Sequence, residues 1–174
     1  MKRIGKGSFS AAYLDTDGCT VWIKSVDPIK ECMALYFDES PYFPKVERED
    51  FGLYKMRFYE KVTAPKRALD SDQYASYSYL RDIMPEIHCG KVDIRAAFEG
   101  CPDSAMGEAL LYAYDACRLY GDDIKFEISP RNIAAENGKM VFLDVFFQDE
   151  VLRKVRSKRD WFKSELAAIN LPKR

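Results

Sequence analysis

The stretch KFEISPRNIAAENGKMVFLDVFF, from Lys125 to Phe147, holds the residues on which the interpretation of this sequence depends. Glu127 is followed five positions later by Asn132, and Asp144 comes after an Asn-Gly pair and an apolar run. The Asn-Gly pair predicts a tight turn, and MVFLDVFF after it is expected to be a strand. An acid, an amide and a second acid at these intervals suit a general base and two oxygen ligands for a hard cation. That chemistry requires groups for phosphate elsewhere in the chain.

The composition argues against several classes of protein. The 174 residues include 27 basic and 28 acidic side chains, which gives no support for general nucleic-acid binding or for binding to anionic membranes. Five cysteines, an odd number without a C-x-x-C pair, and a single histidine argue against a disulfide framework or a zinc site. No apolar run reaches the roughly 18 residues that span a bilayer, and the N-terminus lacks the apolar core of a signal peptide. We therefore expect a soluble, cytoplasmic protein.

The sequence pattern changes near Val62, from short apolar segments separated by turns to longer helical periodicities. Strands are expected over residues 2–4, 11–14 and 20–24, near Val46, and over residues 53–58, with a helix from Pro28 and a charged turn over residues 47–50. A connector over residues 63–72 precedes helical patterns over residues 74–83, 93–100 and 106–121. The chain ends in one basic amphipathic helix pattern from Val151.

Two features of the first thirty-one residues bear on phosphate chemistry. In GKGSFSAAY, Gly5 and Gly7 let backbone N–H groups approach phosphate oxygens, with Phe9 at the tip, although a simple hairpin turn explains the same pattern. Lys24 ends the strand VWIK, and Glu31 follows seven residues later on the expected helix. Lys24 and Glu31 suit a lysine held by a carboxylate in a phosphate site, although taken as an isolated pair they are better explained as two ordinary surface charges.

The order of these segments resembles that of protein kinases over about residues 3 to 147. GKGSFSAAY stands at the place of the Gly-rich loop, VWIK at that of V-A-I-K, EISPRN at that of the catalytic loop, and LDVF at that of D-F-G. The FSAAY loop, the small size and the short C-terminal half are also similar to those of the serine/threonine protein kinases of T7-type bacteriophages.

The resemblance implies an α+β, two-lobed protein-kinase-like fold. A small antiparallel β lobe with one helix is expected over residues 1–62, and a reduced, mainly helical lobe over residues 63–174. The implied activity is transfer of phosphate from ATP, with Mg2+, to serine or threonine of a protein, and the protein is a host protein if the chain is phage-encoded. No nucleic-acid or membrane partner is expected.

The resemblance also implies a role for each matching residue. Lys24 would contact the phosphates and pair with Glu31, and Asn132 and Asp144 would hold Mg2+. Glu127 would stand at the place of the catalytic aspartate. The glycine turn would cover the phosphates with Gly5, Gly7, Ser8 and Phe9, and backbone groups at Glu60 and Val62 would contact adenine.

The sequence departs from the kinase pattern in ways that leave a second interpretation open. Glu127 replaces the aspartate, and its extra methylene displaces the carboxylate by on the order of 1 Å. Ser10 replaces the third loop glycine, and Phe146 replaces the D-F-G glycine, which predicts a fixed Asp144. There is no A-P-E sequence. The alternatives are a pseudokinase that binds or inhibits a host protein without phosphoryl transfer, and a small-molecule phosphotransferase.

The role of the basic C-terminal segment is also left open by its sequence. Its charges suit a solvated helix face, or a dock for an acidic partner. They are Arg153, Lys154, Arg156, Lys158 and Arg159.

Overall fold

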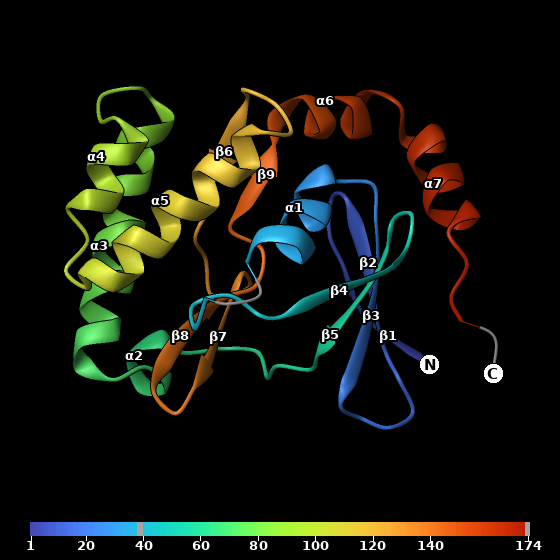
Figure 1. The fold of residues 1–174 in the computed structure, drawn as a ribbon, viewed down its shortest axis with the longest axis horizontal. Coiled ribbons are helices and arrows are strands. Elements are labelled where there is room, and N and C mark those ends of the chain that lie inside the picture. Colours follow the sequence, from blue (N-terminus) through green and yellow to red (C-terminus); the bar gives the residue numbers. More distant parts are fainter. Residues whose placement is uncertain (38–39, 173–174) are drawn as a thin grey trace.

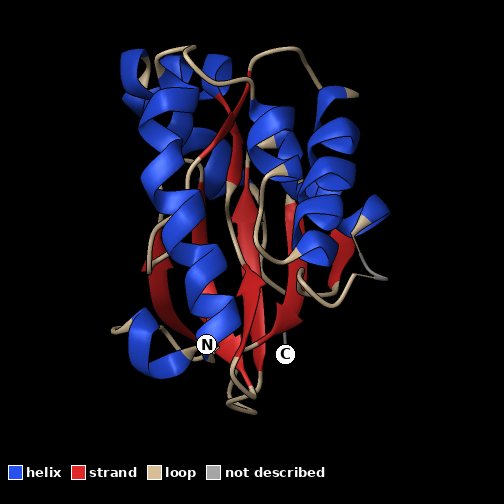
Figure 2. Cartoon of the chain, turned by 90° about the vertical axis from the view of Figure 1, so that its left-hand side faces the viewer, coloured by secondary structure: helices blue, strands red, loops and turns tan. Residues whose placement is uncertain are grey.

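The computed structural model describes residues 1–37 and 40–172 and has a mixed α/β architecture. Its described residues form a five-stranded antiparallel sheet, two two-stranded sheets and seven helices (Figure 1). The five-stranded sheet lies at one end of the molecule and helices α2 to α5 at the other, with the short strand pairs between them (Figures 1 and 2). No helix among the described residues is long and apolar enough to cross a membrane.

The five-stranded sheet and one helix form the N-terminal part of the chain, as the sequence predicts. Its strands run in the order β1-β2-β3-β5-β4. They are β1 (Lys2–Lys6), β2 (Ser10–Leu14), β3 (Thr20–Ser25), β4 (Val46–Asp50) and β5 (Leu53–Arg57). Helix α1 (Pro28–Tyr36) follows β3 after two residues, and the Asp27 carboxylate caps it by accepting the Ile29 N–H at 2.9 Å.

The expected charged turn over residues 47–50 is wrong, because these residues form strand β4. β4 is the edge of the sheet, where charged side chains are favoured because they discourage pairing with another chain. Lys55 on the neighbouring β5 pairs with Glu47 at 2.9 Å and with Glu49 at 2.5 Å. The actual turn follows at Phe51 and Gly52, where Gly52 adopts the positive φ of +70°.

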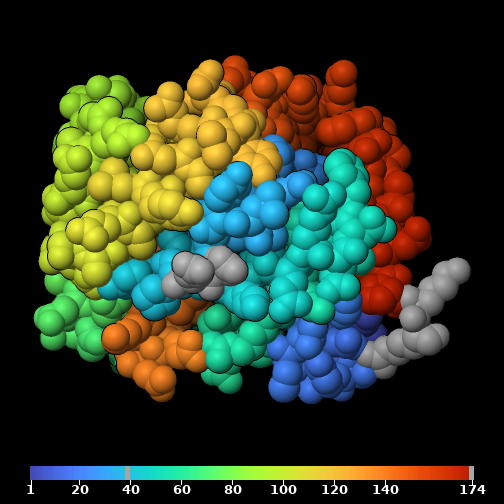
Figure 3. All heavy atoms as spheres, in the orientation of Figure 1, coloured from blue at the N-terminus to red at the C-terminus, as the bar shows by residue number. Residues whose placement is uncertain are grey.

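Four helices lie between Val62 and β6, and each packs against the next one along the chain. They are α2 (Pro65–Ala68), α3 (Ser71–His88), α4 (Ile94–Glu99) and α5 (Ser104–Arg118). Helix α5 has the predicted periodicity, and Met106, Leu110 and Ala113 on it are fully buried. On the face in Figure 3, α5 lies directly against α1, which joins these helices to the N-terminal sheet.

Residues 124–148 form four short strands, and the single strand expected over MVFLDVFF is divided between two of them. These are β6 (Ile124–Phe126), β7 (Ile133–Glu136), β8 (Lys139–Phe142) and β9 (Phe146–Gln148). β7 and β8 form a hairpin around Asn137 and Gly138, whose φ angles of 51° and 80° fit the predicted Asn-Gly turn. MVFLDVFF is interrupted between β8 and β9, because the N–H groups of Leu143 and Asp144 donate to the Asn132 carbonyl instead of a strand partner.

The C-terminal segment is two helices, where the sequence predicts one. Helix α6 (Asp149–Ser157) buries Leu152 and Val155, and helix α7 (Arg159–Ala168) begins after a break at Lys158. Helix α7 lies beside the β4–β5 turn, drawn in red beside teal in Figure 3. One buried core extends from Val21 to Phe146, across the expected boundary between residues 62 and 63, and that boundary stays a prediction.

Candidate active site

A cleft of about 860 Å³ separates the β1–β2 turn from the segment that carries Glu127 and Asp144. Eight of the residues predicted from the sequence line it. They are Gly5, Gly7, Ser8, Phe9, Val62, Glu127, Asn132 and Asp144. They come from four separate places in the chain: the β1–β2 turn, the segment after β5, the loop between β6 and β7, and the break between β8 and β9. The fold therefore brings the glycine turn and the acid-amide-acid set to one cavity.

The expected pair of Lys24 with Glu31 is not formed. The Lys24 Nζ lies 3.5 Å from the carbonyl of Leu166 on α7, and Glu31 pairs with Arg48 at 2.7 Å. Successive residues of a strand face opposite sides of the sheet, and in β3 the buried side belongs to Val21, Ile23 and Ser25. Lys24 therefore faces away from the core.

Two more predicted residues do not join the cleft. Glu31 lines a different cavity, and Glu60 is exposed and lines neither cavity described here. Of the segment expected to contact adenine, the cleft is lined by Val62 with its neighbours Lys61 and Thr63.

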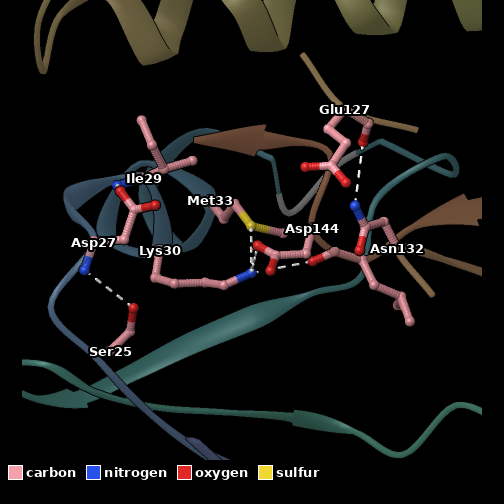
Figure 4. Close-up of polar contacts among 9 residues, drawn as sticks. Ser25, Asp27, Ile29, Lys30, Met33, Glu127, Asn132 and Asp144 are labelled. Atoms are coloured by element: carbon pink, nitrogen blue, oxygen red, sulfur yellow. Dashed lines mark hydrogen bonds and ion pairs between the residues drawn. The ribbon is translucent and has the colours of Figure 1, made fainter. Parts of the chain in front are cut away.

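Lys30, which the sequence reasoning missed, supplies the lysine that reaches Asp144. Its Nζ lies 2.8 Å from Asp144 Oδ1, 3.1 Å from the Leu143 carbonyl and 3.4 Å from Met33 Sδ (Figure 4). The side chain is only 7% exposed. A signal was present in the sequence, because Lys30 follows Ile29 and lies one helical turn before Met33, both of which belong to an apolar helix face. The spacing alone gave no reason to prefer it to Lys24.

Asn132 connects the two acids of the motif. Its backbone carbonyl accepts the N–H groups of Leu143 at 2.8 Å and Asp144 at 3.3 Å, and its side-chain nitrogen donates to the Glu127 carbonyl at 3.3 Å (Figure 4). The side-chain oxygen of Asn132 is therefore the atom left to face a ligand. The N–H of Glu127 also donates to the Val145 carbonyl at 2.8 Å. These hydrogen bonds fix the β6–β7 loop relative to the segment between β8 and β9.

The carboxylates of Asp144 and Glu127 differ in their contacts with other side chains. Asp144 is 46% exposed and has one oxygen on Lys30. The carboxylate of Glu127 is exposed, and it has neither a hydrogen bond nor an ion pair with the residues that the structure describes. Glu127 is therefore available to accept a proton at the cleft, whereas Asp144 is held in place.

Aromatic side chains fix the segment after Asp144. Phe146 is buried, and its ring lies 5.6 Å from that of Phe126 and 6.1 Å from that of Phe98, measured between centroids. Phe147 stacks on Phe9 at the tip of the glycine turn, with a centroid distance of 6.0 Å. A phenylalanine at the place of the D-F-G glycine thus ties Asp144 to the core, and the next one ties the glycine turn to β9.

The oxygen atoms of the cleft suit Mg2+. Mg2+ is usually held by one or two protein oxygens together with substrate phosphates and water, not by an all-protein cage. Asn132 and Asp144 supply such oxygens, and no group of three or more His, Cys, Asp or Glu side chains is placed to hold a metal in the described part of the chain. The donor set therefore fits a metal that arrives with a phosphate ligand.

Asp27, beside this site, has an unusual protonation equilibrium. The pKa of its carboxyl group is raised from 3.8 to about 7, and burial is the largest cause. The Ile29 N–H and Lys30 lower this pKa, and the negative charge of Asp144 contributes to raising it. Figure 4 shows Asp27 and Lys30 at the start of the same helix, with the Lys30 side chain reaching toward Asp144. Asp27 is thus a buried acid that titrates near neutral pH.

Comparisons with known proteins add little to this geometry. No protein-family model matches the chain, and no curated protein sequence matches it. A solved structure, the ternary complex of streptomycin, ATP and the aminoglycoside phosphotransferase APH(2″)-IIa, is similar over 84% of this chain and 67% of its own. The sequences are 11% identical, and the TM-score of 0.36 is too low to carry an argument about fold or activity.

Proposed function

We propose that this chain is a compact, ATP- and Mg2+-dependent phosphotransferase of protein-kinase-like fold that acts on serine or threonine of a protein. The observation that carries the proposal is the convergence of Asn132, Asp144 and Glu127 beneath a glycine turn in one cleft. Lys30 does not line this cleft, but it pairs with Asp144 from behind it. If the chain is phage-encoded, as its resemblance suggests, the acceptor is a protein of the host.

In this proposal, Lys30 and the glycine turn bind the phosphates of the nucleotide. Gly5 and Gly7 line the cleft, and because they have no side chain the backbone of this turn can approach phosphate oxygens closely. Lys30 already carries its positive charge beside Asp144, and burial keeps that charge poorly screened by water. In this proposal Lys30, and not Lys24, contacts the phosphates.

Asn132 and Asp144 are the residues that would hold Mg2+, with the amide oxygen and the carboxylate as the available donors. When bound, the metal offsets phosphate charge during transfer. The backbone hydrogen bonds from Leu143 and Asp144 to the Asn132 carbonyl keep the two ligands together before a nucleotide binds. This pre-formed arrangement reduces the reorganisation that binding requires.

Glu127 is the group that orients the acceptor hydroxyl and takes its proton. Its carboxylate is exposed at the cleft and without a partner among the described residues, so a hydroxyl on a large molecule reaches it. This accessibility is what supports a protein acceptor over a small molecule enclosed in a pocket. The main chain on either side is fixed by the bonds to Val145 and Asn132.

The Phe9–Phe147 stack supports a second candidate function, a pseudokinase-type module that binds a host protein without phosphoryl transfer. The stack joins the glycine turn to β9 on the side of Glu127 and Asp144. A cleft that stayed closed there would still hold a nucleotide but would exclude an acceptor. The two functions differ in whether phosphate leaves the nucleotide.

The test is transfer of label from γ-labelled ATP with Mg2+, to the protein itself and to a bacterial lysate. We expect label with wild type and with Lys24→Met, and a loss of about 10²-fold or more with Lys30→Met and with Asp144→Asn. Lys24→Met is the matched control, because Lys24 lies outside the cleft and contacts α7. Label lost with Lys24→Met and retained with Lys30→Met would contradict the assignment of Lys30. No transfer from the folded wild type would favour the binding module.

A further inference from the structure

A second cavity, of about 490 Å³, lies between helix α7, the β4–β5 turn and the start of α1. We call it the α7 cavity. It shares no lining residue with the cleft that holds Glu127 and Asp144. Its volume falls within the range of roughly 300 to 1,000 Å³ that is typical of small-molecule sites. Nothing in the proposed phosphotransfer uses it.

The lining of the α7 cavity is negatively charged. Four of its residues are acids, and no lysine, arginine or histidine lines it within the described ranges 1–37 and 40–172. Glu31 is neutralised by Arg48, but Asp27, Asp50 and Glu165 have no ion pair with any described residue. A cation is therefore the ligand that this charge favours.

Aromatic side chains also line the α7 cavity. Trp161 of α7 is 41% exposed, Phe51 of the β4–β5 turn is 78% exposed, and Tyr54 is buried behind them. Aromatic faces attract cations electrostatically, and they also contact the apolar part of an organic ligand. Acids together with aromatic surface favour an organic cation over a bare metal ion, because a metal ion needs oxygen ligands and gains nothing from aromatic surface.

Asp27 supplies a buried acceptor in this cavity. It is only 5% exposed, and one of its carboxylate oxygens accepts the Ile29 N–H at 2.9 Å. The second oxygen has no hydrogen-bond donor among the residues that the structure describes. Every fully buried side-chain oxygen in that part of the chain has a partner, so this oxygen is not fully buried, and Asp27 lines the α7 cavity.

We infer that the α7 cavity binds a small organic cation, with its ammonium group on Asp27 and its apolar part against Trp161. Desolvation makes an unpaired carboxylate unfavourable, and an ammonium ion that reaches it restores a charged hydrogen bond. Asp27 also caps the helix that carries Lys30, so the site lies at the base of the element that reaches Asp144.

The test uses benzylamine as the probe and benzyl alcohol as its uncharged analogue, with binding to the full chain measured by calorimetry at about pH 8, where Asp27 is ionised. We expect saturable binding of benzylamine and affinity at least about tenfold lower for benzyl alcohol. Asp27→Asn keeps a helix cap and removes the charge, and it should weaken benzylamine by a similar factor. No nucleotide is present, so the result does not depend on phosphotransfer.

Two further variants test the aromatic contact and control for the loss of a negative charge elsewhere on the surface. Trp161→Ala, on the outer wall, should weaken benzylamine by about fivefold or more if the aromatic contact contributes. Glu108→Gln, an exposed acid of α5 outside the cavity, should leave the affinity unchanged. Equal affinities for benzylamine and benzyl alcohol, no effect of either cavity variant, or no saturable binding of benzylamine would each overturn the inference.

Discussion

At the scale of single residues, the buried acid Asp27 makes the stability of the molecule fall as the pH rises. Its folded pKa of about 7 lies above the unfolded value of 3.8, so the folded state binds the proton more tightly. Below about pH 4 the Asp27 carboxyl group is protonated in both the folded and the unfolded state, so it does not reduce the free energy of unfolding. As the pH rises toward 7, the unfolded state ionises first, and the folded state loses stability relative to it. Above 7 the loss is complete.

We therefore predict that Asp27→Asn becomes increasingly stabilising, relative to wild type, between about pH 4 and 7. The difference in unfolding free energy should grow by on the order of 2 to 4 kcal/mol, because asparagine keeps the cap and carries no charge to bury. Urea denaturation of both proteins across this range measures it. A difference that is the same at every pH would show that Asp27 is not a buried acid in solution.

The second residue-scale prediction concerns Glu127. Glu127→Gln keeps the size of the side chain and removes its ability to accept a proton. If Glu127 acts as the base, kcat should fall by about 10² to 10⁴-fold while KM for ATP changes little, because the nucleotide contacts are made by other residues. Steady-state kinetics of the phosphotransfer measures both constants. Glu99→Gln, an exposed acid of α4 outside the cleft, is the matched control, and an unchanged kcat in Glu127→Gln would remove Glu127 from the mechanism.

The sequence predicted Asn132 and Asp144 in one cleft but not Lys30, and the reason is physical. Asn132 and Asp144 are brought together by a hairpin whose Asn-Gly turn is visible in the sequence. The choice between Lys24 and Lys30 depends on which face of β3 is buried and on how soon α1 begins after it. A shift of one residue moves a strand side chain to the opposite face, and spacing alone does not resolve that shift.

At the scale of elements, the β4–β5 turn and α7 are tightly fitted. A Cβ on Gly52 would lie 2.8 Å from Ile169 Cδ1 and 2.9 Å from the Ser25 carbonyl, and Gly52 also has a φ of +70°. Gly18, in the turn between β2 and β3, has the same φ of +70°, but a Cβ there would have no atom within 4 Å. Comparing substitutions at the two glycines therefore distinguishes the cost of backbone strain from the cost of crowding.

We predict that Gly18→Ala destabilises the protein by about 1 kcal/mol, the strain of a left-handed residue. Gly52→Ala should destabilise it by about 2 to 4 kcal/mol, because the Ser25 carbonyl and Ile169 after α7 must also move. Urea denaturation of the two variants gives the comparison directly. Equal losses would mean that α7 does not rest on the turn in solution.

The elements that sequence reasoning missed are the ones whose position in the fold overrides their local pattern. The charges of β4 indicate a turn when taken alone, but an edge strand exposes its side chains and accepts them. The apolar run around Asp144 indicates one strand, but Asn132 takes the hydrogen bonds of its middle residues. In contrast, α1 and α5 were predictable, because a proline start and helical periodicity are local properties.

At the scale of the whole molecule, the question is whether the N-terminal sheet and the helices after Val62 are separate folding units. Their contacts include the Lys30–Asp144 ion pair, the Arg57–Glu136 ion pair, and Phe43 between Phe37 and Phe142. These contacts accompany a buried core that continues across the boundary. The free energy of each part therefore depends on the other.

We accordingly predict a single cooperative unfolding transition. In Trp161→Phe, the remaining Trp22 lies in β3 and reports on the sheet by its fluorescence, while far-UV circular dichroism is dominated by the helices, most of which follow Val62. The two signals should give the same urea midpoint and the same slope, because one buried core spans both parts of the chain and neither part can lose it alone. A fluorescence transition that precedes the loss of helix would instead make residues 1–62 an independent lobe. In that case the Lys30–Asp144 contact would be too weak to join the two parts, and closure on a nucleotide would have to supply the difference.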